Sequence, residues 1–280
     1  CVRVVFPGNR HGCDGCRRRV FPGRIIGVHG TLMTMRATLF ISLVLGHAVM
    51  ATGVGLVQAA PPGAAAANPA INRPYVNPDV DYWRRVFESE QREIYRYRHD
   101  ILAALNLRPG MGVADVGAGT GFFSLMFARA VGDGGRVYAV DISPEFISAI
   151  EDRAAAEGLG NVTGVVNSQS SLPLAPGSVE LVFISDTYHH FEDPRAMLDG
   201  IRAALVPGGE VAVVDFRRVA GQSGPWVMGH VRAGAEVVIG ELEAAGFQLE
   251  ERLEFMRSQY FLRFRKPPST QTHGATRPGG

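Results

Sequence analysis

Short apolar runs alternate with amphipathic stretches along most of the chain from Asp81 onward. The apolar runs predict five β-strands, at residues 112–116, 136–140, 162–166, 179–185 and 210–216. Apolar residues at helical spacing predict helices between them, after Gly121, after Ser143, over 193–205 and over 235–245. Because buried parallel strands are apolar on both faces, this alternation predicts an α/β fold: a doubly wound, mostly parallel sheet with helices on both faces.

Further elements are expected at both ends of this region. Residues 247–255 and 259–265 are close enough in sequence to pair as a C-terminal antiparallel hairpin. An apolar stripe over residues 83–105 predicts one helix ahead of the first strand. We therefore expect a single domain over residues 81–266, followed by a disordered tail at 267–280.

The first 80 residues follow other patterns. Residues 1–32 show no helical or strand period and are expected to be a non-native or disordered leader. The apolar run 37–57 follows Arg36 and ends in small residues suited to a cleavage site, so 33–59 is predicted to be a signal peptide or, uncleaved, a membrane anchor. Residues 60–80 are rich in Pro and Ala and are interpreted as a linker. These features predict an exported, periplasmic or extracytoplasmic protein that can be anchored in the membrane, with a cytoplasmic location as the alternative.

Charge is divided between the same two parts of the chain. The sequence has 28 basic and 27 acidic residues, but residues 1–59 contain seven Arg and one acid, and 60–280 contain 21 basic and 26 acidic residues. An acidic body lacks the basic stripe that nucleic acid requires, so no nucleic-acid partner is expected. All three cysteines lie in the first sixteen positions, where Cys13 and Cys16 form a CxxC pair without the second pair that a zinc site needs. No metal site is expected.

A glycine-rich loop follows the first strand. Asp115 closes that strand, and Gly117, Gly119 and Gly121 stand at alternate positions before a helix begins. Glycines let the backbone turn tightly and approach a ligand without a Cβ clash, and the helix N-terminus offers free N–H groups. Asp141 lies twenty residues after Gly121, at the tip of the second strand, where a carboxylate can accept both hydroxyls of a ribose. The loop is therefore expected to bind a nucleotide-like cofactor.

The charge of this loop distinguishes between two such cofactors. A dinucleotide loop has the spacing G-x-G-x-x-G, and Phe122 stands where its last glycine is required. Asp115 would also repel a pyrophosphate, whereas it would attract the amino group of a methionine-like cofactor. S-adenosylmethionine is therefore the expected cofactor.

In several segments the chain resembles class I S-adenosylmethionine-dependent methyltransferases, in particular their small-molecule branch, which includes quinone- and lipid-methylating enzymes. These segments are residues 113–123, 137–141, 172–173 with 177–182, and 206–209. The resemblance covers about residues 81–266 and implies a Rossmann-like sheet of seven strands with the last one inserted antiparallel. It also implies methyl transfer from S-adenosylmethionine to a small-molecule or lipid-like acceptor. Arsenic is not expected as the acceptor, because the related enzymes use cysteines and residues 81–266 contain none. The alternative is an exported, non-catalytic domain of the same fold that binds a nucleotide-like ligand.

The resemblance also assigns cofactor contacts. Those to the methionine part would come from Asp115, Gly117, Ala118, Gly119, Thr120 and Gly121. Asp141 would hold the ribose, with Ile142 against the adenine. Members of the family usually have an Asp before the Leu-Pro segment, where this chain is neutral, so Ser168 or Gln169 would accept the hydrogen bond of the adenine amino group. Asp186 is expected to shape the cofactor pocket.

Proton acceptors gather in the loop after the fourth strand. Methyl transfer from a sulfonium is an in-line displacement, for which the protein supplies alignment and, for some acceptors, a base. Tyr188, His189 and His190 are the candidate catalytic residues, because this loop leaves the same sheet edge as the glycine loop and an imidazole suits deprotonation of a phenol or enol. In the alternative interpretation, one histidine caps the next helix and the other packs against Phe191.

Two further segments could cover a substrate. Residues 88–98 form a charged, Tyr-bearing stretch, and 217–234 form a long connection at the functional edge of the sheet. The alternatives are a solvated helix face with a Glu88–Arg92 pair for the first segment, and core packing of Trp226 for the second. The oligomeric state stays open.

Overall fold

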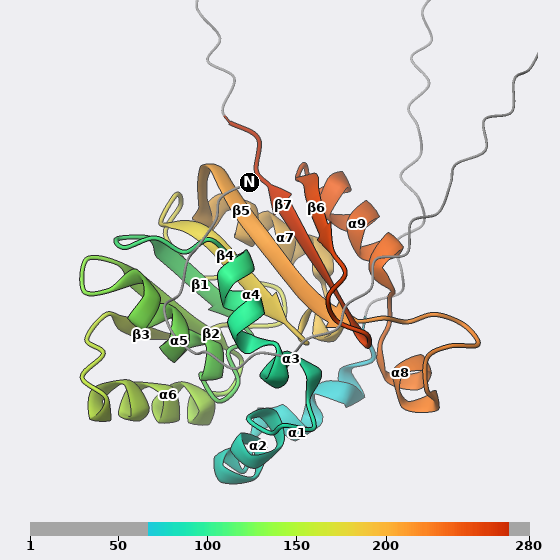
Figure 1. Ribbon diagram of the computed structural model, residues 1–280, viewed down its shortest axis with the longest axis horizontal. Helices are drawn as coiled ribbons and strands as arrows, with labels where there is room; N and C mark the ends of the chain where they lie inside the picture. The colour runs from blue at the N-terminus through green and yellow to red at the C-terminus, as the bar shows by residue number, and fades with distance from the viewer. Residues whose placement is uncertain (1–66, 269–280) are drawn as a thin grey trace, which may run out of the picture. The chain divides into compact units, whose positions relative to one another are not determined.

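The strands of the protein form one sheet in the computed structural model, which describes residues 67–268 (Figure 1). In this part of the chain the strand order is β3-β2-β1-β4-β5-β7-β6. The bounds are β1 Gly112–Val116, β2 Arg136–Asp141, β3 Val162–Val166, β4 Val179–Ser185, β5 Leu205–Phe216, β6 Gln248–Leu253 and β7 Gln259–Arg265. Strands β1 to β5 run parallel, and β7 is inserted antiparallel between β5 and β6. The predicted doubly wound, mostly parallel sheet with a C-terminal antiparallel hairpin is confirmed.

Helices cover both faces of this sheet. The connecting helices are α5 Phe122–Val131, α6 Pro144–Ala156, α7 Pro194–Ala204 and α9 Ala235–Ala244. Side chains alternate along β4, so that Val182 and Ile184 join one core with α7 and α9, while Leu181 and Phe183 join another with α5. Figure 1 shows α7 behind the sheet and α4 (Arg98–Ala104) in front of it. Both faces are therefore buried, which explains the continuous apolar runs of the central strands.

Capping side chains fix the starts of α6 and α7. Ser143 Oγ accepts the N–H of Phe146 at 3.2 Å, and Asp193 Oδ1 accepts that of Ala196 at 2.9 Å. A proline follows each cap at the start of the helix, where the missing N–H removes no helical hydrogen bond. The N–H of Ser143 also donates to Asp141 at the end of β2, which ties that strand end to the start of α6. Helix α7 follows soon after the short helix η2 (Tyr188–His190), which carries the candidate histidines.

The segment ahead of the sheet differs from its prediction. In place of one helix over residues 83–105 there are three, α2 Val80–Phe87, α3 Glu93–Arg96 and α4. The chain leaves the helical conformation at Glu88, whose carboxylate accepts hydrogen bonds from Thr120 Oγ1 at 3.0 Å and from Arg153 Nη1 at 2.7 Å. These contacts across the glycine loop outweigh the local helical pattern.

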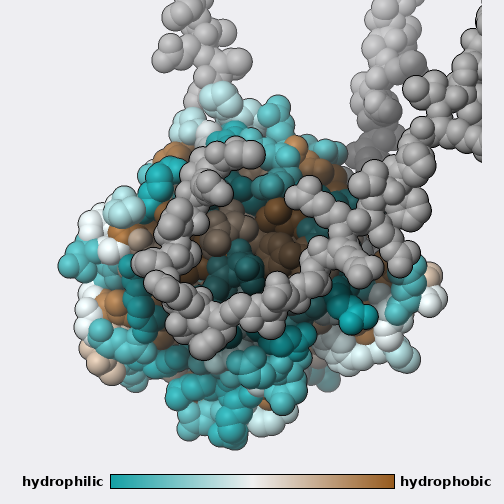
Figure 2. Space-filling view, in the orientation of Figure 1, coloured by the Kyte–Doolittle hydropathy of each residue, from teal (hydrophilic) through white to brown (hydrophobic). Residues whose placement is uncertain are grey.

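The folded part also begins earlier than predicted. The short helices η1 (Pro69–Asn72) and α1 (Arg73–Val76) stand where the sequence predicted a linker. The predictions of a leader, a signal peptide or anchor, and most of the tail fall in residues 1–66 and 269–280, outside the described residues. Between residues 67 and 268, no helix is both long and apolar enough to cross a bilayer. On the face shown in Figure 2, hydrophilic residues dominate the periphery and hydrophobic ones gather near the middle.

Candidate active site

A cavity of about 500 Å³ lies at the carboxyl ends of the parallel strands. The loops after β1, β2, β4 and β5 form one wall, with Gly117, Ile142, Thr187 and Phe216 among the lining residues. The opposite wall comes from η1, α1, α2 and α8 (Pro225–His230). The carboxyl edge of an open parallel sheet is where ligands bind in this class of fold, and the volume suits a small-molecule cofactor with its substrate.

The glycine loop follows closely the path that its sequence predicts. Gly117, Gly119 and Gly121 have φ values of +74°, +54° and +77°, which glycine adopts without strain. A Cβ on Gly117 would lie 2.2 Å from Thr187 Cγ2, so no side chain fits at this position. Ala118, Gly119 and Thr120 line the cavity with Gly117. Gly121 does not, because it packs against Ile150 beneath the loop.

Two buried carboxylates stand under this loop. Asp141 accepts the N–H of Gly119 at 2.8 Å and that of Ser143 at 3.0 Å, and its burial raises its pKa to about 6. Asp115 accepts a hydrogen bond from Ser124 Oγ at 2.6 Å, and burial raises its pKa to about 7. Both side chains line the cavity. Buried carboxylates of raised pKa favour a ligand that brings hydroxyl donors or a positive charge to them.

A third polar residue, Asn167, stands beside Ser168 and Gln169, the residues expected to accept the hydrogen bond of the adenine amino group. Ile142, Ser168 and Gln169 all line the cavity, but Ser168 Oγ already shares a 2.8 Å hydrogen bond with Ser171 Oγ. Asn167 Oδ1 is buried and has no hydrogen-bond partner among residues 67–268. A buried carbonyl oxygen without a partner is costly, so Asn167 Oδ1 is a further acceptor available to a ligand N–H, beside Gln169.

Asp186 lines the cavity, but its carboxylate is held by the protein. It forms an ion pair with Arg92 and accepts two 3.1 Å hydrogen bonds from Gln259 Nε2. Its backbone stands at φ +48°, with its N–H donated to Val214 O at 2.8 Å. Asp186 therefore shapes the pocket, as the sequence predicted, while its charge is balanced by Arg92.

This ion pair also corrects the expectation for residues 88–98. The Glu88–Arg92 pair of a solvated helix does not form, because Arg92 bonds to Asp186 and Glu88 bonds to Arg153. The guanidinium of Arg92 also lies 4.9 Å from the ring centre of Phe87, a residue that lines the cavity. The stretch is therefore part of the wall of the site.

His189, the middle residue of η2, is buried with only one ring nitrogen engaged among the described residues. Its backbone N–H and its Nδ1 bond to the two carboxylate oxygens of Asp215, at 3.0 and 2.8 Å. Its Nε2 is buried without a partner in the described part of the chain, and the residue lines the cavity. Burial alone would lower the pKa of His189, but the Asp215 carboxylate outweighs burial and raises it.

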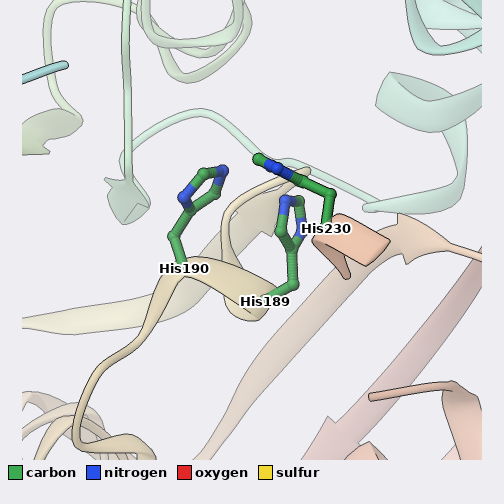
Figure 3. A group of neighbouring side chains, drawn as sticks. All are labelled: His189, His190 and His230. Atoms are coloured by element: carbon green, nitrogen blue, oxygen red, sulfur yellow. The ribbon is translucent and has the colours of Figure 1, made fainter. Parts of the chain in front are cut away.

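Two more imidazoles lie beside His189 (Figure 3). His190 Nδ1 lies 2.8 Å from Asn72 Oδ1, and burial together with His189 lowers the pKa of His190 to about 3. His230, from α8, stacks on Trp226 with ring centres 4.5 Å apart. The ring centres of the three histidines are 4.2 to 5.3 Å apart. Trp226 is 57% exposed and lines the cavity, so it is not a core residue.

Tyr188 does not join this cluster. Its side chain is fully buried in the core, its hydroxyl donates to Glu241 at 2.8 Å, and the guanidinium of Arg232 lies over its ring. Burial, reinforced by the Glu241 carboxylate, raises the pKa of Tyr188 far above its ordinary value. His189 and His190 line the cavity, whereas the contacts of Tyr188 with Glu241 and Arg232 hold its ring in the core.

Sequence reasoning missed Asp215 and Asn72, the two residues that orient the histidines. Asp215 carried a usable signal, since it is an acid near the carboxyl end of an otherwise apolar strand. Asn72 carried none, because it lies 118 residues from His190 in a segment that looks like a linker.

Comparisons with known proteins agree with this geometry. Residues 113–209 match a family model described as a methyltransferase domain. The "Ubiquinone/menaquinone biosynthesis C-methyltransferase UbiE" of Hydrogenovibrio crunogenus is 33% identical over 123 residues, which are 44% of this chain and 48% of that protein. The "Arsenite methyltransferase" of Halobacterium salinarum is 31% identical over 153 residues, 52% of this chain and 39% of that protein. The chain thus spans about half the length of these curated relatives, or less.

The fold has solved counterparts. The crystal structure of a "SAM dependent methyltransferase from Aquifex aeolicus" superimposes with a TM-score of 0.56 and covers 71% of this chain and 98% of its own. The two sequences are 23% identical, so this likeness speaks for the fold alone.

Proposed function

Because the chain carries a class I S-adenosylmethionine-dependent methyltransferase domain, we propose that it transfers the methyl group of S-adenosylmethionine to a small-molecule acceptor held in the cavity. The observation that carries the proposal is the pair of buried carboxylates beneath the glycine loop, Asp115 and Asp141. Neither has a basic partner among residues 67–268, and both line the cavity.

The residues present suit the cofactor. Asp141 offers carboxylate oxygens to the ribose hydroxyls, and Asp115 offers a negative charge to the amino group of the methionine part. Ile142 supplies an apolar surface for the adenine ring, and Asn167 Oδ1 an unpaired acceptor for its amino group. The backbone of Gly117 approaches the cavity closely because no side chain can stand there. When bound, S-adenosylmethionine supplies an electrophilic methyl group.

The remaining wall indicates the class of acceptor. Tyr75, Trp83 and Phe87 form an aromatic group with ring centres 4.8 to 6.4 Å apart, and Trp226 faces the cavity from α8. Polar contacts to an acceptor are available from the imidazoles of His189 and His190. An aromatic wall with imidazole nitrogens suits a flat, apolar acceptor that carries a hydroxyl or enol. Such an acceptor is consistent with the similarity to a quinone C-methyltransferase.

The protein aligns and shields the reaction. The glycine loop and Asp141 fix one side of the cavity, and the segment from η1 to α2 closes the other. We call this segment, residues 69–87, the cover of the cavity. Directly after it, Glu88 bonds to Thr120 and Arg153, and Arg92 forms an ion pair with Asp186. These contacts hold the cover over the glycine loop. Holding two reactants in line and excluding water is the main contribution a protein makes to this transfer.

Calorimetric titration of the full chain with S-adenosylmethionine tests the cofactor part of the proposal. We expect saturable binding, reduced about 100-fold in Asp141→Ala through loss of charge-assisted hydrogen bonds. Asp133→Ala removes an exposed carboxylate and should bind like the wild type. Absence of heat with the wild-type chain would contradict the proposal.

Transfer itself needs a second assay. The protein and methyl-labelled cofactor are incubated with extracted metabolites and lipids, and labelled products are identified by mass spectrometry. Binding of the cofactor without any labelled product would instead indicate a non-catalytic binding domain.

A further inference from the structure

Three imidazoles converge at one side of the cavity. His189 and His190 come from η2, at the end of β4, and His230 comes from α8, forty residues later. One ring nitrogen from each histidine lies within 4.8 Å of those of the other two. Figure 3 shows the rings of the three residues gathered in a small space between the two elements.

The far nitrogens of two of these rings are fixed by hydrogen bonds. His189 Nδ1 donates to the carboxylate of Asp215 at 2.8 Å, which leaves Nε2 with its lone pair toward the cavity. His190 Nδ1 donates to Asn72 Oδ1 at 2.8 Å, so Nε2 is the nitrogen that its ring can offer to a ligand. Metal-binding histidines are typically oriented by such a carboxylate or carbonyl on the second nitrogen. Ring packing alone would not require either bond.

The charges around the cluster also favour a cation. Asp186 is paired with Arg92, and Glu241 with Arg232. Among the described residues, Asp215 accepts only from the N–H groups of His189 and the backbone of Phe216. The His189 imidazole is the one side chain bonded to it in residues 67–268, and a cation bound at His189 Nε2 would balance the buried charge in place of a proton on that ring.

We propose that His189, His190 and His230 together bind one divalent transition-metal cation, with zinc as the reference metal. Imidazole nitrogens suit Zn²⁺, Co²⁺ or Ni²⁺ and are poor ligands for Mg²⁺ and Ca²⁺. Three protein nitrogens leave one coordination position open, as in catalytic rather than structural zinc sites. The sequence analysis expected no metal, because His189 and His190 are adjacent and His230 lies forty residues later, a spacing that matches no metal-binding motif.

Metal binding requires a small closure of the site. Tetrahedral coordination at about 2.0–2.1 Å per bond places the ligand nitrogens roughly 3.4 Å apart. The distances between the three histidine nitrogens, now up to 4.8 Å, must therefore shorten when the metal binds. His230 is the ligand that can move, because α8 is short and its residue Trp226 is 57% exposed.

The open coordination position would face the cavity that holds the acceptor. A role of the metal in methyl transfer rests on the proposed function and specifies its acceptor further. A cation at this site would bind the hydroxyl oxygen of the acceptor and lower the pKa of that hydroxyl, so that its proton is released to solvent water and the oxygen is held as an oxyanion. The acceptor class is thereby narrowed to molecules with a phenolic or enolic oxygen near the atom that receives the methyl group.

The test is a titration of the chelator-treated full chain with Zn²⁺ and with Co²⁺, without S-adenosylmethionine. Cys13 and Cys16 are replaced by Ser throughout, because thiolates outside the proposed site can bind the same cations. We expect one equivalent per chain and, with Co²⁺, visible absorption of a four- or five-coordinate site.

Variants locate the site. His230→Ala and His190→Ala should each weaken binding at least 100-fold, and Asp215→Asn about 10-fold through loss of orientation of His189. His99→Ala removes an exposed histidine of α4 and should leave the affinity unchanged. His230→Asn serves as a second variant, and circular dichroism checks that each chain is folded.

Two results would overturn the inference: no saturable binding of either cation, or equal affinity in the wild type and in folded His230→Ala. Calorimetry with S-adenosylmethionine on the same samples separates this outcome from a failure of the proposed function. A chain that binds the cofactor but no metal refutes the metal site alone, and one that binds metal but transfers no methyl group refutes the proposed function alone.

Discussion

The carboxylate of Asp215 binds His189 twice, through the backbone N–H at 3.0 Å and through ring Nδ1 at 2.8 Å. One contact fixes where the loop after β4 lies, and the other fixes how its imidazole is turned. Since Asp215 belongs to β5, the strand next to β4, the register of the sheet brings the two residues together. Asp215 is thus a positioning residue for the imidazole that faces the cavity.

Asp215→Asn is expected to slow methyl transfer about 10- to 100-fold while leaving the Kd of S-adenosylmethionine unchanged. The amide can accept one of the N–H groups but adds donors that have no acceptor nearby, so His189 loses its fixed orientation. The free energy of unfolding should also fall by about 1–3 kcal/mol, because buried hydrogen-bonding groups lose their partners. Single-turnover rates at saturating cofactor, with calorimetry and thermal unfolding on the same samples, measure the three quantities. A parallel loss of cofactor affinity would show that Asp215 supports the whole site and not His189 in particular.

Gly117→Ala is expected to weaken cofactor binding at least 100-fold. The substitution places a Cβ 2.2 Å from Thr187 Cγ2 and a side chain at φ +74°, so the glycine loop and the loop after β4 must separate. Backbone strain alone costs about 1–3 kcal/mol, and the collision adds to it. Calorimetry with S-adenosylmethionine should show at least a 100-fold weaker Kd.

Gly132→Ala is the matched control for this change. Gly132 has φ +65°, but a Cβ there meets nothing within 4 Å. It should therefore lower stability by about 1 kcal/mol and leave cofactor binding unchanged. Equal binding in Gly117→Ala and Gly132→Ala would mean that the close approach of the glycine loop to Thr187 has no role in binding.

The parts of the site that the sequence predicts depend on neighbours along the chain. Asp115, the glycine loop and Asp141 follow from strand ends and a helix start, because a parallel sheet brings its carboxyl ends to one edge. The central strands could also be predicted from local sequence, because burial on both faces leaves continuous apolar runs. The Asp215–His189 pair depends instead on the order of strands, which places β5 beside β4.

The cover over the cavity could not be predicted, because long-range contacts override local patterns there. The apolar stripe over residues 83–105 indicates one helix. The helix nevertheless ends before Glu88, whose carboxylate bonds to Thr120 and Arg153. The bond from Asn72 to His190 spans 118 residues and lies in a proline-containing segment with no period at all. Such contacts leave no repeat in the sequence.

Glu88→Gln is expected to loosen this cover and weaken cofactor binding about 10-fold. The change removes the ion pair with Arg153 and weakens the contact with Thr120, and one charge-assisted hydrogen bond contributes about 1.5–3 kcal/mol. The dissociation rate of S-adenosylmethionine, measured by stopped-flow fluorescence of the tryptophans, should increase accordingly. Glu157→Gln breaks an exposed pair with Arg129 and serves as the control, since such surface pairs contribute little. A similar rate in both variants would rule out a role for the Glu88 contacts in retaining the cofactor.

The buried acids predict how the stability of the cofactor-free protein depends on pH. Burial raises the pKa of Asp115 to about 7 and that of Asp141 to about 6, both above the unfolded value near 4. The folded state therefore holds more protons between pH 4 and 7, and these groups make the free energy of unfolding fall as pH rises through that window. Asp115→Asn removes one such group, so it should stabilise the protein at pH 8 by up to about 4 kcal/mol and flatten the decline. Chemical denaturation at pH 5.5 and 8 measures this difference.

Cofactor binding should depend on pH in the opposite direction. Asp115 and Asp141 can attract a cationic amino group and accept hydroxyl hydrogen bonds fully only when ionised, so the affinity for S-adenosylmethionine should fall as pH drops below 7. Protonation of Asp115 alone predicts a loss of about 10-fold per pH unit below its pKa, and protonation of Asp141 steepens the fall below pH 6. Calorimetry at pH 7.5, 6.5 and 5.5 measures the slope, and Asp115→Asn should bind more weakly at pH 7.5 with a shallower slope. An affinity that stays constant over this range in the wild type would show that neither carboxylate changes ionisation when the cofactor binds.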